Sequence, residues 1–240
     1  MRSATLGNER SIWISPPNDP SRANRLIIFL DAELYREKVG APAIVDALRS
    51  TDAVADSWCV FVSYETVESR WKECPCFPPF VVFVVDELLP FLGSLHAEIA
   101  RCDRRTLIGL SYTGLAAAYV AHERPRVFDH VIAQSASFWW NDCWLIRDVA
   151  ARPMSQETAF WLEVGERETQ TELHHRPDVF QEISQIEGVR RFYEVLREQG
   201  CRVAYRPMPG GAHDTTSWAK TLPDALRWAS DQLTEDASAC

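Results

Sequence analysis

The chain has 240 residues, of which 46% are hydrophobic and 25% are charged, and its formal net charge is −9. These fractions are typical of a globular protein, and the length suits one large α/β domain or two small ones. The acidic balance argues against a nucleic-acid binder held by phosphate contacts. The sequence has no continuous apolar run of roughly 18 residues, so we expect no membrane span. The nine tryptophans indicate an aromatic-walled pocket or interface, or simply a large core.

The N-terminus and the cysteines bear on the compartment. The first nine residues lack the apolar stretch of a secretory signal, which argues against export. The seven cysteines are scattered, and the Cys74-Pro75-Cys76 spacing is too short for the usual zinc or redox motif. We therefore expect free thiols in a reducing environment and a cytoplasmic protein.

Short apolar segments alternate with helical patterns along the chain. Strands are predicted at residues 11–15, 25–31, 58–64, 105–110, 128–134, 160–164 and 201–207. Helices are predicted at residues 41–50, 86–101, 112–122, 177–199 and 218–233. Residues 65–85 contain three prolines and are predicted to be irregular. The tryptophan-rich segment 138–154 shows neither a clear helical nor a clear strand periodicity, and whether it forms a lid is left open.

This alternation predicts an α/β fold with a mostly parallel central sheet and helices on both faces. No internal repeat and no linker rich in Pro, Gly or Ser divides the chain, so residues 1–240 are expected to form a single domain. In open parallel sheets, active groups lie on loops beyond the carboxyl ends of strands. That rule directs the search for chemistry to three loops.

The loops after three of the predicted strands carry a hydroxyl, a carboxylate and an imidazole, in that chain order. They hold Ser111, then Glu166 and Glu168, then His213. Serine by itself is a poor nucleophile and needs an adjacent base, and imidazole can take and return a proton near neutral pH. A carboxylate fixes the imidazole tautomer. The order of serine, acid and histidine is that of the α/β-hydrolase triad.

Ser111 stands at a predicted turn from a strand into a helix, where a nucleophile would be exposed. The pattern G-x-S-x-G begins at Gly109, but Thr113 stands where its second glycine belongs, and Gly114 comes one residue later. A β-branched side chain at that position is expected to crowd the close approach of strand and helix. The alternative is an ordinary turn in which Ser111 caps the helix.

Several segments together carry a family resemblance. They are residues 107–119, 125–128, 134–140, 30–31, 70–73, 87–90, 162–168 and 209–213, followed by Trp218. These segments resemble the esterase family that includes enterochelin (ferric-siderophore) esterases, S-formylglutathione hydrolases and mycolyl-transferases. The Ser-x-Ser-Phe-Trp-Trp run of residues 135–140 is most similar to the enterochelin esterase branch. The resemblance covers residues 10–233 and implies an α/β-hydrolase fold and serine ester hydrolysis.

The resemblance also implies roles for single residues. Carried over position by position, Ser111 is the nucleophile and His213 is the base. Glu168 aligns best with the acid of the family, and Glu166 and Asp214 are the alternatives.

The resemblance further implies two backbone N–H donors for the oxyanion. They are that of Tyr112 and one from the loop after Asp31, from Ala32 or Glu33. Three positions depart from the family pattern: Ala32 and Thr113 replace glycines, and Ala212 is inserted before the histidine. The first two departures bear on the oxyanion hole.

Aromatic and basic residues near these loops are candidates for binding substrate. Trp139 and Trp140 follow the strand next to that of the nucleophile and are expected to form a substrate wall or to pack in the core. Arg70 is expected either to contact substrate or to pair with Glu73.

The remaining patterns favour no cofactor and no metal. The tandem histidines 174 and 175 have no neighbouring ligand set and are expected to be a solvated surface pair. Neither a dinucleotide-binding nor a Walker motif is present in the sequence.

The sequence therefore predicts a cytoplasmic serine esterase that acts on a small-molecule ester through an acyl-enzyme, and the resemblance implies a catecholate siderophore ester. No nucleic-acid or membrane partner is expected, and the oligomeric state is left open. Two alternatives are an acyltransferase that uses the same triad and a non-catalytic binding protein with a degraded oxyanion hole.

Overall fold

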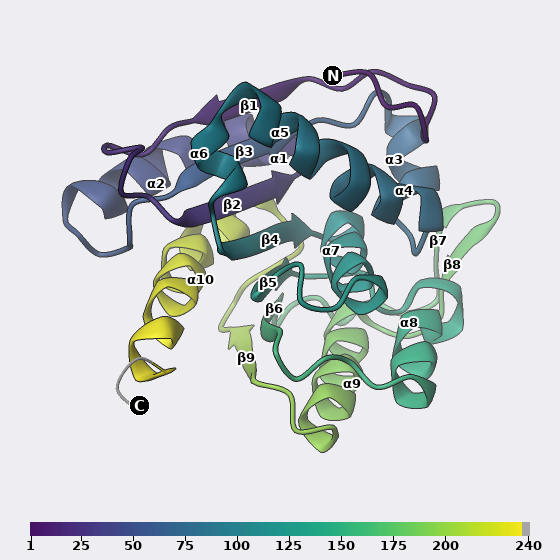
Figure 1. Cartoon of the computed structure of the whole chain (residues 1–240). Coiled ribbons are helices and arrows are strands. Elements are labelled where there is room, and N and C mark those ends of the chain that lie inside the picture. Colours follow the sequence, from purple (N-terminus) through teal and green to yellow (C-terminus); the bar gives the residue numbers. More distant parts are fainter. Residues whose placement is uncertain (237–240) are drawn as a thin grey trace.

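A seven-stranded sheet forms the centre of the protein (Figure 1). The computed structural model describes residues 1–236, with side chains through Asp231. In spatial order the strands are β1 (Ile12–Ser15), β3 (Trp58–Val62), β2 (Arg25–Leu30), β4 (Arg104–Leu110), β5 (His130–Gln134), β6 (Ala159–Gly165) and β9 (Val203–Met208). Only β1 is antiparallel to its neighbour among these strands, so the predicted mostly parallel sheet is confirmed. Cys240 and the side chain of Leu233, which falls in the predicted last helix, lie outside the described part.

Helices surround this sheet, as predicted. They are α1 (Ala32–Leu34), η1 (Tyr35–Val39), α2 (Ala41–Ser50), α3 (Val67–Glu73), α4 (Pro78–Val82), η2 (Phe83–Leu88), α5 (Leu89–Leu95), α6 (Ala97–Ala100), α7 (Tyr112–Glu123), α8 (Trp140–Ala151), α9 (Gln185–Glu198) and α10 (Thr215–Asp236). Figure 1 shows α2 and α10 on one side of the sheet, and α7, α8 and α9 on the other. A separate hairpin is formed by β7 (Leu173–Arg176) and β8 (Val179–Gln181).

The core has two layers because successive side chains of a strand point to opposite faces of the sheet. In β2, Ile28 and Leu30 belong to the layer that packs against α7 and α9, whereas Phe29 belongs to the layer under α2 and α10. All three side chains are buried. The continuous apolar runs of the sequence are therefore strands covered on both faces.

The prediction that residues 65–85 are irregular is wrong. The helix α3 begins in a capping box, in which the Thr66 hydroxyl accepts from the Ser69 N–H and the Ser69 hydroxyl accepts from the Thr66 N–H. The helix α4 has Pro78 in its first turn. Proline is favoured there because the first N–H groups of a helix have no partner within the helix, so this proline starts a helix rather than interrupting one.

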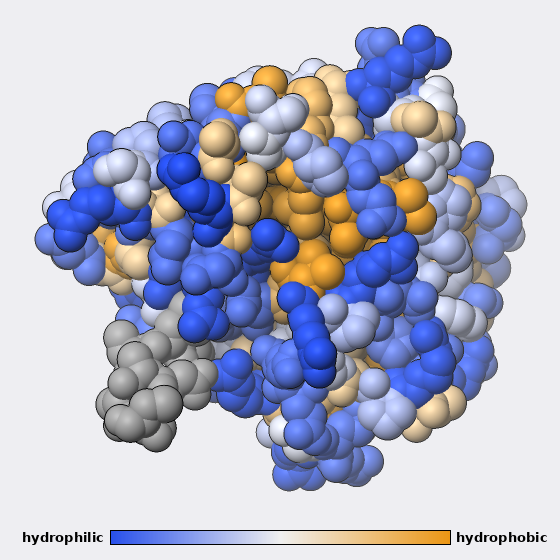
Figure 2. Space-filling model, in the orientation of Figure 1, coloured by the Kyte–Doolittle hydropathy of each residue, from blue (hydrophilic) through white to orange (hydrophobic). Residues whose placement is uncertain are grey.

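The helical stretch Pro78–Leu95 is long and apolar enough to cross a membrane by length and composition, with a mean hydropathy of 1.5. Its Phe80, Phe83 and Leu88 are buried in the core against the sheet. Figure 2 shows apolar side chains gathered on this face of the molecule, surrounded by hydrophilic residues. One third of the stretch is buried, and its other residues are half-buried or exposed.

One further segment differs from the prediction, and one that the prediction left unassigned contains a helix. The expected helix 177–199 begins only at Gln185, where the Ser184 hydroxyl accepts from the Glu187 N–H, because β8 occupies the residues before it. The segment 138–154 contains α8, whose first turn has three consecutive residues with positive φ, from Asn141 to Cys143.

Glu163 is a buried carboxyl group near the end of β6. It accepts hydrogen bonds from Trp161 Nε1 and Gln134 Nε2, both at 2.8 Å, and from the Thr221 hydroxyl. Burial raises the pKa of Glu163 to about 7, although these hydrogen bonds oppose the rise. The folded state therefore favours the protonated form. The stability that this preference contributes is fully present below the unfolded pKa of about 4.5 and is lost as pH rises through 7.

We expect Glu163→Gln to remove this part of the pH dependence. The free energy of unfolding of the variant relative to wild type should rise by on the order of 3 kcal/mol between pH 5 and pH 8, to be measured by urea unfolding at both values. The stability difference between the two proteins is taken at each pH, so the contributions of other titrating groups cancel. One such group is His130, whose pKa is lowered to about 4 by burial. An equal stability difference at the two pH values would contradict the expectation.

Candidate active site

Ser111 occupies a sharp turn between β4 and α7. Its backbone has φ 52° and ψ −121°, a conformation that non-glycine residues rarely adopt. The turn is tight, because a Cβ at Gly109 would lie 2.1 Å from the Thr113 carbonyl oxygen and one at Gly114 would lie 2.8 Å from the Ala136 Cβ. The two glycines that this turn requires are therefore Gly109 and Gly114.

The crowding expected from Thr113 does not occur. Its side chain turns back onto the end of β4, where its hydroxyl donates to the Leu110 carbonyl at 2.8 Å and accepts from the Leu110 N–H at 3.0 Å. The close approach of helix and strand is made by Gly114 instead, one residue later. The departure from the family pattern thus moves the second glycine by one position, and the turn itself is kept.

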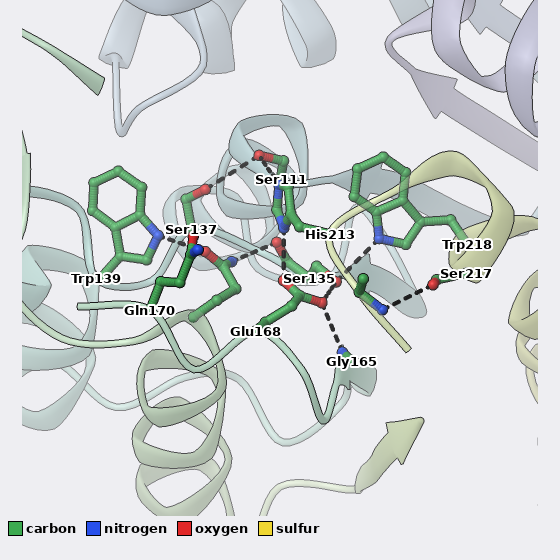
Figure 3. Close-up of polar contacts among 12 residues, drawn as sticks. Ser111, Ser135, Ser137, Trp139, Gly165, Glu168, Gln170, His213, Ser217 and Trp218 are labelled. Atoms are coloured by element: carbon green, nitrogen blue, oxygen red, sulfur yellow. Dashed lines mark hydrogen bonds and ion pairs between the residues drawn. The ribbon is translucent and has the colours of Figure 1, made fainter. Parts of the chain in front are cut away.

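The structure brings Ser111, His213 and Glu168 together from three loops (Figure 3). Ser111 Oγ lies 3.1 Å from His213 Nε2, and His213 Nδ1 lies 2.6 Å from Glu168 Oε2. The other Glu168 oxygen accepts from the Gly165 N–H at 2.7 Å and from the Ser135 hydroxyl at 2.6 Å. The Glu168 side chain is 2% exposed and that of His213 is 40% exposed. A buried carboxylate thus orients an imidazole whose far nitrogen meets the hydroxyl.

The two alternative carboxylates lie elsewhere. Glu166 is exposed, and its Oε2 accepts from the Gly210 N–H at 3.3 Å. Asp214 accepts from the Ser217 N–H at 2.8 Å at the start of α10. Among the three candidates, Glu168 is the carboxylate in contact with His213.

The two expected oxyanion donors each begin a helix. Tyr112 is the first residue of α7, and Ala32 is the first residue of α1, directly after Asp31 with φ 73°. N–H groups in the first turn of a helix have no partner within that helix, and the helix dipole favours negative charge there. The positive φ at Asp31 sharpens the turn out of β2, as the one at Ser111 does after β4.

Arg70 pairs with Asp31, so the expected pair of Arg70 with Glu73 is wrong. Its Nε and Nη2 lie 2.9 and 2.6 Å from Asp31 Oδ2. Although burial would lower it, the ion pair with Asp31 raises the pKa of Arg70. Glu73 turns the other way and pairs with Arg10. The reason is long-range. Arg70 is half-buried and the other three charged groups are buried, and each pairs with an opposite charge from a different segment of the chain.

A pocket of about 530 Å³ opens over Ser111 and His213. Its aromatic wall consists of Trp71, Tyr112, Trp139 and His175. The rings of Trp139 and His175 are stacked, with centroids 4.9 Å apart and an interplanar angle of 13°. Arg70 also lines the pocket, so two of the three residues expected to bind substrate, Trp139 and Arg70, lie on it.

Trp140 lies elsewhere: it lines a neighbouring hollow of about 410 Å³ beside Phe180. Trp139 lines both cavities, whereas Trp140 lines the hollow and not the pocket over Ser111, because adjacent residues at the start of a helix point in different directions. Trp218, which stands after the histidine in sequence, is buried behind it, with the ring centroids of Trp218 and His213 5.1 Å apart.

Sequence reasoning missed two contributions to the site. The β7–β8 hairpin supplies Leu173, His175 and Gln181 to the pocket wall, and His175 Nε2 lies 2.8 Å from Gln181 Oε1. His174 and His175 are both exposed, as expected of a surface pair, but strand neighbours point to opposite sides, so His174 packs on Phe180 while His175 lines the pocket. The second missed residue is Ser135. In the sequence, it could have been recognised only by its place in the segment 134–140, which carries part of the family resemblance.

One group outside the pocket has the residue types of a metal site. Ligand atoms of His122, Glu123 and Asp148 all lie within 4.8 Å of one another. However, Arg152 Nη2 donates to Glu123 at 2.6 Å and to Asp148 at 2.5 Å. The guanidinium already supplies the compensating positive charge, so the group is an ion-pair cluster.

The sheet and its surrounding helices define an α/β-hydrolase. Residues 3–229 match the family described as "Putative esterase", and the chain belongs to this family. It is 32% identical, over 95% of its length, to the iron(III) enterobactin esterase of Dickeya dadantii, and 29% identical, over 94%, to that of an Escherichia coli O6:H1 strain. A crystal structure of the enterobactin esterase of Shigella flexneri in the presence of enterobactin superposes with a TM-score of 0.82 at 25% identity, covering 97% of this chain. The chain spans 53%, 54% and 58% of the length of these proteins, or about half.

Proposed function

We propose that this protein is a serine esterase that hydrolyses a carboxylic ester through an acyl-enzyme. The observation that carries the proposal is the hydrogen-bonded series Ser111–His213–Glu168 beneath an open pocket, with distances of 3.1 and 2.6 Å. The family match supports the same activity.

The proposed reaction runs in two halves. Ser111 Oγ attacks the ester carbonyl carbon while its proton moves to His213 Nε2, and the N–H groups of Tyr112 and Ala32 hold the negative oxygen. The bond to the leaving alcohol then breaks, and the alcohol takes the proton from His213. Water attacks the acyl-Ser111, giving its proton to His213, and the carboxylic acid leaves as Ser111 recovers its hydrogen. Glu168 holds the imidazole in the tautomer that each half requires.

The substrate that we propose is a small-molecule ester of the siderophore type. The names of the relatives support this class, since they are esterases of iron(III) enterobactin. The stacked Trp139 and His175 rings offer a flat surface to an aromatic acyl group. We further propose that residues 1–240 act as one catalytic domain in the cytoplasm; the six cysteines of the described part are free thiols, which fits a reducing compartment.

Hydrolysis of p-nitrophenyl butyrate, with and without added ethanol or glycerol, tests the proposal. We expect turnover with butyric acid as the product in both cases. Butyryl esters of the added alcohol as the main product would favour an acyltransferase instead. A rate indistinguishable from that of buffer, for this ester and for a catecholate ester, would favour the non-catalytic binding protein.

A further inference from the structure

Four side chains behind the nucleophile form a closed circuit of contacts (Figure 3). Glu168 Oε2 lies 2.6 Å from His213 Nδ1, and the His213 and Trp218 rings meet edge to face, with centroids 5.1 Å apart and an interplanar angle of 84°. Trp218 Nε1 donates to Ser135 Oγ at 3.0 Å, and Ser135 Oγ donates to Glu168 Oε1 at 2.6 Å. The acid and the base therefore touch each other directly and are also linked through Ser135 and Trp218.

The chemistry of the groups fixes the direction of each hydrogen bond. An indole N–H can only donate, so the Ser135 oxygen must accept from Trp218. The single hydroxyl hydrogen of Ser135 is then free to point at Glu168, whose ionised carboxylate can only accept. Ser135 and Trp218 are 1% and 5% exposed, so water does not compete for these bonds.

The backbone of Ser135 is held in an unfavourable conformation. Its φ is 45°, in the left-handed region, and the residue follows the end of β5. Its N–H donates to the Glu163 carbonyl at 2.8 Å, and its carbonyl accepts from Gln185 Nε2 at 2.5 Å. Both bonds tie the strained residue to neighbouring elements. A non-glycine residue in this region costs free energy and persists where the surroundings hold it.

We propose that Ser135 and Trp218 are positioning residues that act as one unit on the Glu168–His213 pair. The hydroxyl fixes the rotation of the carboxylate, and the indole, held by that hydroxyl, limits the tilt of the imidazole. This inference rests on the proposed function, because it assigns the pair a role in the same reaction. Without the unit the imidazole still reaches Ser111, but in a broader range of orientations. A displacement of about 1 Å in such a group can lower the rate about 100-fold.

Ser135→Gly and Trp218→Phe separate this role from a merely structural one. Glycine adopts a positive φ without strain, so Ser135→Gly removes the hydroxyl and keeps the backbone conformation. Phenylalanine keeps an aromatic ring against His213 and removes the N–H. Trp161→Phe is the matched control, because it also removes an indole N–H that donates to a buried carboxyl group, that of Glu163, whose side chain accepts hydrogen bonds from Trp161, Gln134 and Thr221 and from no residue of the triad.

We expect each single variant to lower kcat for p-nitrophenyl butyrate by about 10- to 100-fold with KM changed by less than about threefold. The double variant should lose no more than the worse single variant, because the two residues serve one function. The control should keep kcat within about twofold of wild type, as expected for a site away from the reacting groups.

Three outcomes would overturn the inference: single variants with wild-type kcat, losses confined to KM, or losses that multiply in the double variant. Thermal melting of every variant shows whether a rate is measured on folded protein. If wild type turns over and the Ser135 and Trp218 variants have the same kcat, this inference alone is refuted. An inactive wild type would refute the proposed function itself.

Discussion

Ser111→Ala is expected to lower kcat for p-nitrophenyl butyrate by about 10⁴-fold or more. Alanine lacks the oxygen that forms the acyl bond, so the reaction falls back on water attacking an ester held in the pocket. The residual rate then reflects only the oxyanion donors and binding. The backbone effect of the change is small, because serine and alanine are similarly disfavoured at the φ of 52° found here.

The matched control for this variant is Ser94→Ala, which removes an exposed hydroxyl that bonds only to the Phe91 carbonyl within its own helix. That variant should turn over like wild type. Mass spectrometry of protein quenched during turnover should find the acyl group on the peptide that contains Ser111. Equal rates for wild type and Ser111→Ala would rule out this serine as the nucleophile.

Glu168→Gln should lower kcat by about 10³- to 10⁴-fold, by comparison with the same change in other triads. Glu168 is 2% exposed and accepts from three donors, of which His213 Nδ1–H is one. A glutamine has one acceptor oxygen where Glu168 has two, so its N–H₂ group faces either His213 Nδ1 or the two donors Gly165 N–H and Ser135 hydroxyl. Facing Nδ1, it favours the tautomer whose Nε2 carries the hydrogen, which cannot accept the proton of Ser111; facing the other two donors, it opposes them and displaces the side chain from His213.

Glu166→Gln is the control from the same loop. Glu166 is exposed and bonds to a backbone N–H at 3.3 Å, so its variant should keep nearly the wild-type rate. Full pH–rate profiles of both variants show whether a lower rate reflects a lower maximal kcat or a shifted pH optimum. A loss of activity in Glu166→Gln alone would transfer the role of the acid to Glu166.

The five central strands of the sheet could be predicted from sequence because they are covered on both faces, and burial on both sides demands short, continuous apolar runs. The edge strands β1 and β9 are partly exposed, and β1 was recognisable by alternation instead. Among the elements that the prediction missed or misplaced are α3, the start of α4, the hairpin and the start of α9. Prolines, exposed positions and two adjacent histidines produce no apolar period there, so local pattern carries little information.

The candidate site, like the fold, could be predicted from sequence only in part. Ser111, the carboxylates and His213 could be located by rule, since carboxyl ends of parallel strands meet at one edge of a sheet. Which carboxylate meets the imidazole was decided by the path of the loop after β6, in which the Glu168 N–H bonds back to the Gly165 carbonyl at 3.0 Å. That turn directs Glu168 inward and leaves Glu166 in solvent.

The fold class, the chain order of Ser111, the candidate carboxylates and His213, and the turn at Ser111 were all predictable from the amino-acid sequence. These depend on local periodicity and on the general geometry of parallel sheets. Three further features became known from the folded chain: the partner of Arg70, the division of the tryptophans between pocket and interior, and the place of Ser135 behind Glu168. Those outcomes depend on contacts between residues 33 or more positions apart, such as Ser135 with Glu168. A buried charge or N–H group takes whichever partner the folded chain brings near, and sequence spacing does not specify that choice.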